Sequence, residues 1–230
     1  MFITFMDDSG GPRRFPWANT FLILLNLAVC YKTASRHDFG EIVRAYGFIP
    51  AKPLTIGILT APFIHMSWGH LAANMTFLYM FGRMVESRIG ARAYLICYLF
   101  CALGAEAAHW YFNPQTELAL VGASRVVTGI GAIYLLMYPW GKMKWMFSFF
   151  GVPILEIPSR TLFVFALWAA FLAALSMFPS DSVKTAASLF KVPLLSNNPS
   201  AGIAWRAHLG ALVTGVVLFF LIPKKGSAKN

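Results

Sequence analysis

The sequence predicts an all-α membrane protein with six transmembrane helices and a long, interfacial first connection. Three observations predict this class. Of the 230 residues, 58% are hydrophobic and only 12% are charged, whereas soluble domains carry about 25% charged residues. The mean hydropathy is +0.62. Apolar stretches close to the roughly 20 residues that a helix needs to cross a bilayer also recur along the chain.

Six apolar segments are expected to be the transmembrane helices. They lie near residues 18–34, 70–86, 91–112, 118–140, 161–178 and 203–222. The second and fourth are less apolar than the others, as expected of helices that line a site. One membrane domain, residues 18–222, is therefore expected between an N-terminal tail of residues 1–17 and a basic C-terminal tail of residues 223–230.

Two connections stand out. Residues 35–69 are semi-apolar and suit a segment that lies in the membrane interface, and Pro50, Pro53 and Pro62 break them into short pieces. Residues 179–202 are polar and rich in Ser, Asn and Pro. They adjoin the sixth segment, where a mobile cap over a site is a hypothesis.

The net charge is +10, and the distribution of the Lys and Arg residues between the connections predicts the orientation. Eleven Lys and Arg residues belong to the two tails and the second and fourth connections, against six on the opposite side. Cytoplasmic loops carry the excess of Lys and Arg, so both termini are expected to be cytoplasmic. We expect a multi-pass protein of a bacterial inner (plasma) membrane. The cations do not form a basic stripe with interleaved aromatics, so no nucleic-acid binding is expected.

Ser124 and His208 carry the functional hypothesis, because polar groups in apolar segments are costly and mark functional sites. A serine hydroxyl becomes a strong nucleophile when a base takes its proton. A neutral imidazole can take that proton and then protonate a leaving amine. The predicted topology puts both residues near the outer ends of their segments, at one depth. No carboxylate lies near His208 in the sequence, so a Ser–His dyad is expected.

Other residues could support this chemistry. His70 and Asn74 are four apart on one helix face and could, with the Ser124 N–H, stabilise an oxyanion. His65 precedes that helix and fits a positioning role and ordinary interfacial structure equally well. Small residues, which allow close helix packing in lipid, would bring the fourth and sixth segments together. These residues are Gly129, Ala211 and Gly215.

Together these motifs resemble the rhomboid family of intramembrane serine proteases. The resemblance rests on Gly122-Ala123-Ser124, Ala207-His208-Leu209-Gly210, the His65…His70…Asn74 helix and Phe81-Gly82-Arg83-Met84-Val85-Glu86…Gly90. It implies a rhomboid-like bundle with Ser124 as nucleophile, His208 as base, and His70 and Asn74 at the oxyanion hole. It implies a structural role for Glu86 at the inner end of the second span. The implied partners are the lipid bilayer and transmembrane protein substrates, whose helices are cut; no metal or cofactor is implied.

Two residues depart from the family pattern. Arg125 stands where a Gly or Ala usually follows the serine, and Thr128 stands where an aromatic usually packs on the histidine. The Arg125 charge could steady an oxyanion, oppose the protonated His208, or snorkel to the outer surface. A rhomboid-like pseudoprotease that binds membrane clients without cutting them is therefore the alternative. A third hypothesis is a small transporter or metal-binding protein that uses His65, His70 and His208.

Three further polar residues lie at the predicted outer side. Glu106 and His109, three apart in the third segment, are expected to pair with each other or to reach the outer interface. No catalytic part is assigned to either. Arg206, two residues before His208, is interpreted as an anchor at the outer interface rather than as a site residue.

Overall fold

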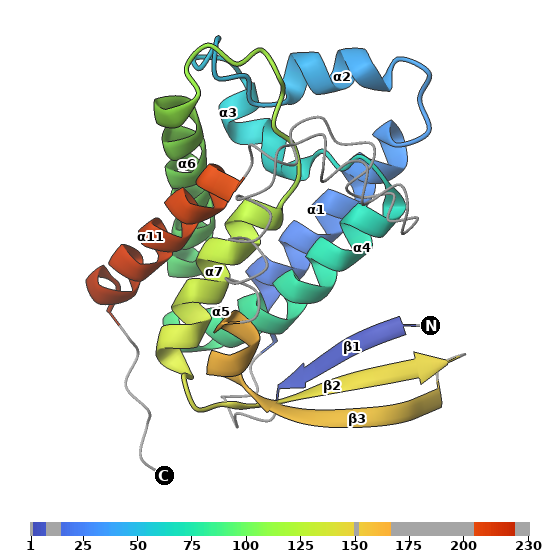
Figure 1. Cartoon of the computed structure of the whole chain (residues 1–230), viewed down its shortest axis with the longest axis vertical. Coiled ribbons are helices and arrows are strands. Elements are labelled where there is room, and N and C mark those ends of the chain that lie inside the picture. Colours follow the sequence, from blue (N-terminus) through green and yellow to red (C-terminus); the bar gives the residue numbers. More distant parts are fainter. Residues whose placement is uncertain (1, 8–14, 150–151, 167–204, 224–230) are drawn as a thin grey trace.

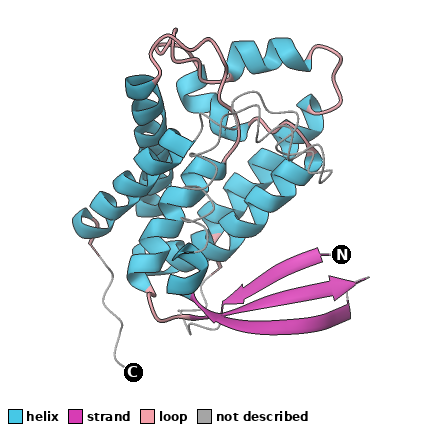
Figure 2. Cartoon of the chain, viewed as in Figure 1, coloured by secondary structure: helices cyan, strands magenta, loops and turns pink. Residues whose placement is uncertain are grey.

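The computed structural model describes residues 2–7, 15–149, 152–166 and 205–223. Helices make up most of this part of the chain (Figures 1 and 2). The long helical elements are α1 (Trp17–Thr33), α4 (Trp68–Phe77), α6 (Ala91–Phe112), α7 (Ser124–Met137) and α11 (Trp205–Leu221). A π-helical stretch, η2 (Leu78–Gly82), and α5 (Arg83–Ile89) continue α4 without a break.

Of the described helices, α6 alone is long and apolar enough to cross a membrane by length and composition. Helices α7 and α11 are shorter apolar helices. A helix also begins at Thr161 and runs to residue 166, where the described part breaks off. Most of the expected fifth span, and the connection of residues 179–202 interpreted as a cap, lie outside the described residues. The count of six spans therefore stays a prediction.

A three-stranded antiparallel sheet corrects the all-α expectation. It consists of β1 (Phe2–Asp7), β2 (Lys142–Phe149) and β3 (Val152–Arg160), in the order β1-β2-β3. Phe2 pairs with Ser148 and Asp7 with Met143, and a register shift follows Phe147 in the β2–β3 pairing. Lys142, Met143 and Lys144 alternate polar, apolar and polar, which is the period-2 pattern of a strand. Both lysines are among the cations of the fourth connection, whose distribution predicts the orientation.

The sheet and the first connection lie at opposite ends of the helical bundle (Figure 1). The first connection forms short pieces, as its prolines predict. They are α2 (Phe39–Tyr46), α3 (Gly57–Thr60) and the 3-10 turn η1 (Ala61–Phe63). Helix α3 contacts α6, and η1 contacts α1, so the connection packs on the bundle at the end from which α7 begins (Figure 1).

The fourth apolar segment is shorter than expected, because α7 begins at Ser124 rather than near residue 118. The preceding residues are extended: Leu120 forms an isolated antiparallel bridge with Phe48, with N–O distances of 2.8 and 3.0 Å. Gly122 then adopts φ +102°, which a side chain would strain. Ser124 therefore begins a helix and does not lie inside one.

The main core lies between α1, η2, α5, α6 and α7, with fully buried residues such as Leu78, Val85, Tyr94 and Ile130. At the η2–α5 end, the buried Glu86 accepts hydrogen bonds from Ala18 N (3.0 Å) and Asn19 N (2.8 Å). These N–H groups belong to the first turn of α1, where a carboxylate also interacts favourably with the helix dipole. Glu86 thus joins the second helical segment to the first.

Candidate active site

Ser124 is the first residue of α7 and is half-buried. The first N–H groups of a helix have no partner within it, and they form the positive end of the helix dipole. The Ser124 hydroxyl and its own N–H therefore lie where an oxyanion is favoured. The Leu120–Phe48 bridge and the Gly122 turn fix this helix start.

His208 lies in the first turn of α11 and is buried. Its Nδ1 lies 2.9 Å from Thr128 Oγ1. Thr128 in turn donates from Oγ1 to the Ser124 carbonyl oxygen, at 3.0 Å. The histidine ring therefore contacts the turn of α7 that Ser124 opens.

Close packing of α7 on α11 allows this contact. A Cβ on Gly129 would lie 2.8 Å from Ala211 O and 2.5 Å from Cys101 Sγ. A Cβ on Gly215 would overlap the Gly129 carbonyl oxygen and lie 3.2 Å from Ala132 Cβ. Since larger side chains would force the helices apart, these positions set how closely His208 approaches α7.

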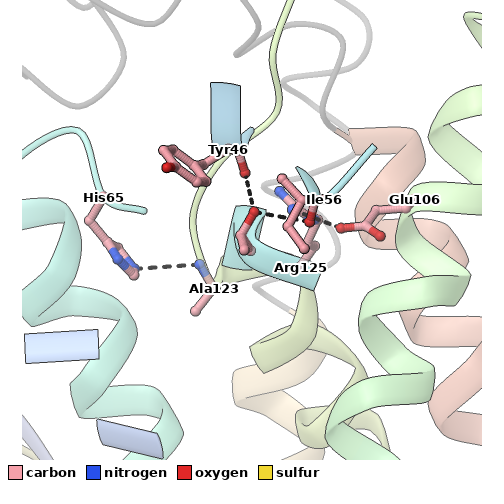
Figure 3. A network of polar contacts seen from close by, with 7 residues as sticks. Tyr46, Ile56, His65, Glu106, Ala123 and Arg125 are labelled. Carbon is pink, nitrogen blue, oxygen red and sulfur yellow. Dashed lines mark hydrogen bonds and ion pairs between the residues drawn. The ribbon is translucent and has the colours of Figure 1, made fainter. Parts of the chain in front are cut away.

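His65 and His70 pack beside the turn that precedes Ser124. A Cβ on Gly122 would lie 2.7 Å from His70 Cε1, and the two histidine ring centroids are 5.1 Å apart, edge to face. His65 Nδ1 donates to Phe63 O (3.3 Å), and its Nε2 accepts from Ala123 N (3.4 Å; Figure 3). One neutral tautomer of His65 satisfies both bonds, so this ring supports the turn that holds Ser124.

The environment of His65 keeps the ring neutral. Burial, together with positive charge on His70 and on Arg125, lowers the pKa of His65 to about 3, although the bond to Phe63 opposes the shift. His65 lies in the connection before α4, outside the spanning helices.

Asn74 lies on α4 and is 6% exposed. Its Nδ2 has no hydrogen-bond partner among the described residues. A buried amide donor without a partner is costly in a folded protein, so this group is available for a ligand oxygen. The first turn of α4 is fixed by Ser67, whose Oγ accepts the His70 N–H at 3.1 Å.

The Arg125 side chain is buried and turned toward α6, which contradicts the alternative that it snorkels to the outer surface. Arg125 and Glu106 are 2% and 1% exposed, and Arg125 Nη2 lies 3.4 Å from Glu106 Oε1 (Figure 3). The two residues thus form a buried ion pair between α7 and α6. The expectation that Glu106 pairs with His109 or reaches the interface is wrong; His109 Nδ1 instead lies 3.4 Å from Asn113 Nδ2.

Arg206 joins the start of α11 to the end of α6. Its Nη1 donates to Phe112 O (3.1 Å) and to Asn113 Oδ1 (2.9 Å), and its guanidinium lies over the Phe112 ring at 5.4 Å. A cation is favourable at the C-terminal end of a helix. The contact therefore fixes α11 close to where it carries His208.

Sequence reasoning missed three contributors to this site. Thr128 was noted only as a departure from a pattern, although a residue four after Ser124 lies on the same helix face. Glu106 was not matched to Arg125, although both are charges in apolar segments. Gly122 was noted only as part of a motif.

The described residues contain no group of three or more His, Cys, Asp or Glu residues suited to a metal ion.

The protein is mostly helical, with Ser124 at the start of α7 and His208 on the tightly packed neighbour α11. Thr128 contacts both residues, at the Ser124 carbonyl oxygen and at His208 Nδ1. A family model described as the Rhomboid domain matches residues 54–225. The chain belongs to the rhomboid family, and this membership implies an integral membrane protein.

Two curated relatives agree with this assignment. The chain is 33% identical over 181 residues to "Rhomboid-like protein 11, chloroplastic" of Arabidopsis thaliana, covering 76% of the chain and 55% of the relative. It is 24% identical over 178 residues to "Rhomboid protein 1, mitochondrial" of Saccharomyces cerevisiae, covering 74% and 42%. The chain thus spans about half the length of these relatives. Their names are organellar, so the expectation of a bacterial inner membrane is not supported.

Proposed function

We propose that this chain is an intramembrane serine endopeptidase that cleaves the transmembrane helices of membrane-protein substrates with a Ser124–His208 dyad. The observation that carries the proposal is the 2.9 Å contact between His208 Nδ1 and Thr128 Oγ1. It supports the proposal because the His208 ring contacts the helix turn that begins with Ser124. Family membership supports the reaction class.

In this mechanism His208 takes the proton from Ser124 Oγ as the oxygen attacks a substrate carbonyl carbon. The carbonyl oxygen becomes an oxyanion, which the Ser124 N–H, Asn74 Nδ2 and His70 stabilise. His208 then gives its proton to the leaving amine, which breaks the C–N bond and leaves an acyl-enzyme. A water molecule, deprotonated by the same histidine, releases the acyl group and restores Ser124.

The proposal includes the membrane arrangement expected from the sequence. Six spans within residues 18–222 cross the bilayer, and tails 1–17 and 223–230 lie on the cytoplasmic side. The substrates are transmembrane proteins that enter from the bilayer. The sheet, built from the N-terminal tail and the fourth connection, then lies on the side opposite Ser124, as the opposite-end arrangement in Figure 1 supports.

The second candidate is a rhomboid-like pseudoprotease that binds membrane clients without cutting them, because Arg125 follows the serine. The ion pair favours the peptidase instead. Arg125 is directed to Glu106 on α6, so its charge is compensated within the protein. If the pseudoprotease reading holds, the parent chain is inactive and Arg125→Gly gains activity.

The test compares purified wild type, Ser124→Ala and His208→Gln in proteoliposomes that contain a transmembrane reporter. Cleavage is expected in the wild type and in Ser87→Ala, and is expected to be lost in both site variants. Ser87 is a suitable control because it is half-buried in α5 and donates to Met84 O at 2.8 Å. Labelling of Ser124 by a fluorophosphonate probe provides a second readout. Equal cleavage by wild type and Ser124→Ala would refute the dyad.

A further inference from the structure

We propose that Thr128 is the positioning residue that fixes the tautomer of His208, in the place that a carboxylate occupies in a Ser-His-Asp triad. This inference rests on the proposed function, and it assigns a role to the residue that stands where an aromatic usually packs on the histidine. The catalytic groups remain Ser124 and His208. Thr128 acts through the histidine and does not touch the substrate.

The hydrogen-bond inventory of Thr128 decides the tautomer. A hydroxyl has one proton to donate and two lone pairs that accept. The Ser124 carbonyl oxygen, 3.0 Å from Thr128 Oγ1, can only accept, so it receives the hydroxyl proton. At 2.9 Å from the same Oγ1, His208 Nδ1 must therefore be the donor. A neutral ring with its proton on Nδ1 carries its basic lone pair on Nε2.

The reverse arrangement is disfavoured on the same distances. If Thr128 donated to His208 Nδ1, its oxygen would face the Ser124 carbonyl oxygen at 3.0 Å with no proton between them. The ring would then carry its proton on Nε2 and present no basic nitrogen on that side. The tautomer that satisfies all three groups is the one that a general base requires.

The location of Thr128 makes this bond effective. Thr128 is 3% exposed, so the hydroxyl is shielded from competing water. It lies one turn after Ser124 in α7, so the same bond that selects the tautomer also ties the base to the helix of the nucleophile. Gly129 and Gly215 allow α11 to approach closely enough for the contact.

The bond persists through the proposed reaction. The proton from Ser124 Oγ goes to His208 Nε2 and then to the leaving amine, while Nδ1–H stays donated to Thr128 throughout. Thr128 keeps its own proton on the Ser124 carbonyl and gains no charge. A neutral acceptor thus orients the ring, whereas the Arg125 charge is balanced separately by Glu106.

The kinetic test uses Thr128→Val, which keeps the branched shape and removes the hydroxyl, and Thr128→Ser, which restores the hydroxyl. With the transmembrane reporter in proteoliposomes, Thr128→Val is expected to lower kcat about 10- to 100-fold, the range for a hydrogen bond to a charged group, with little change in KM. Thr128→Ser is expected to recover most of the loss. Thr33→Val is the matched control, because Thr33 makes the same bond to a preceding carbonyl (Val29 O, 2.8 Å) in α1.

A spectroscopic test needs no activity. Protein with ¹⁵N-labelled histidine is compared with its His208→Gln variant to assign the ring signals. The wild type is expected to show a protonated Nδ1 and an unprotonated Nε2 at His208, and Thr128→Val is expected to shift the ring toward the Nε2–H tautomer that free histidine favours.

The two tests separate the failure of each idea. Unchanged kcat in folded Thr128→Val, or a wild-type ring protonated on Nε2, overturns the role of Thr128 and leaves the dyad intact. A wild type that cleaves nothing overturns the proposed function, while the ¹⁵N signals still decide the tautomer. If Thr128→Val does not fold, Thr128→Ser and the wild-type spectrum decide instead.

Discussion

Substitutions in the buried Arg125–Glu106 ion pair are expected to change the free energy of unfolding by an amount that depends on whether one or both partners are replaced. Both side chains are almost fully buried, and their one recorded contact is 3.4 Å long. Removing one partner of a buried ion pair leaves an uncompensated charge and costs about 3–5 kcal/mol, whereas replacing both by apolar residues is often neutral. Glu106→Leu is therefore expected to destabilise the protein strongly, and Glu106→Leu with Arg125→Met much less.

Arg125 Nε and Glu106 Oε2 have no hydrogen-bond partner within the described ranges. The single variant leaves the buried guanidinium without its ion-pair partner, which is the case that the range of about 3–5 kcal/mol describes. For a chain of this size, about 3–5 kcal/mol corresponds to a fall in Tm of about 6–20 °C.

The assay is thermal unfolding of the detergent-solubilised protein, followed by the fluorescence of its seven tryptophans. Glu117→Gln is the control, since Glu117 is an exposed carboxylate in the loop before α7 and its loss is expected to change stability by less than about 0.5 kcal/mol. A single variant as stable as the wild type, or a double variant as unstable as the single one, would refute the account of Arg125 as a charge neutralised by Glu106.

Glu86, Gly215 and His65 each allow a further test of the packing or of the neutral buried ring. Glu86→Gln should cost about 1–3 kcal/mol in unfolding experiments, because one of the Ala18 and Asn19 N–H groups loses its acceptor. Gly215→Leu should cost about 1–3 kcal/mol and reduce reporter cleavage, because its side chain would meet the backbone of Gly129, whereas Val217→Leu on the exposed face should do neither. His65 has a folded-state pKa of about 3, below its ordinary value of 6.5. The neutral ring therefore contributes its full stabilisation above pH 6.5, and the free energy of unfolding declines as the pH falls from 6.5 toward 3. The slope of the unfolding free energy against pH is expected to reach about 1.4 kcal/mol per pH unit. Unfolding measured across this pH range should show a smaller slope in His65→Gln.

The helices whose limits depend on local sequence were predicted well. The expected segment 91–112 coincides with α6, and 18–34 differs from α1 by one residue at each end. Apolar length and the residues that end a helix are local signals. Gly90, with φ +85°, is one such signal, because it separates α5 from α6.

The features that were missed depend on pairing between distant residues. The start of α7 at Ser124 requires Leu120 to bridge with Phe48, more than 70 residues earlier. The sheet requires β1 to find β2 across most of the chain. A single sequence gives apolar content and periodicity but does not give partners, so a segment that is apolar on both sides of Ser124 was interpreted as one helix.

The two departures from the family pattern share a physical logic that only the contacts reveal. Each departure is a polar group added to α7 beside the serine, and each meets a polar partner from another helix: Arg125 meets Glu106 of α6, and Thr128 meets His208 of α11. A buried polar group is costly unless it is paired, so neither substitution stands alone. The partners lie on α6 and α11, two of the helices that pack against α7, so the same contacts that pair the polar groups also hold these helices beside Ser124. This pairing supports the proposed peptidase over the pseudoprotease, because neither departure leaves an unpaired polar group beside Ser124.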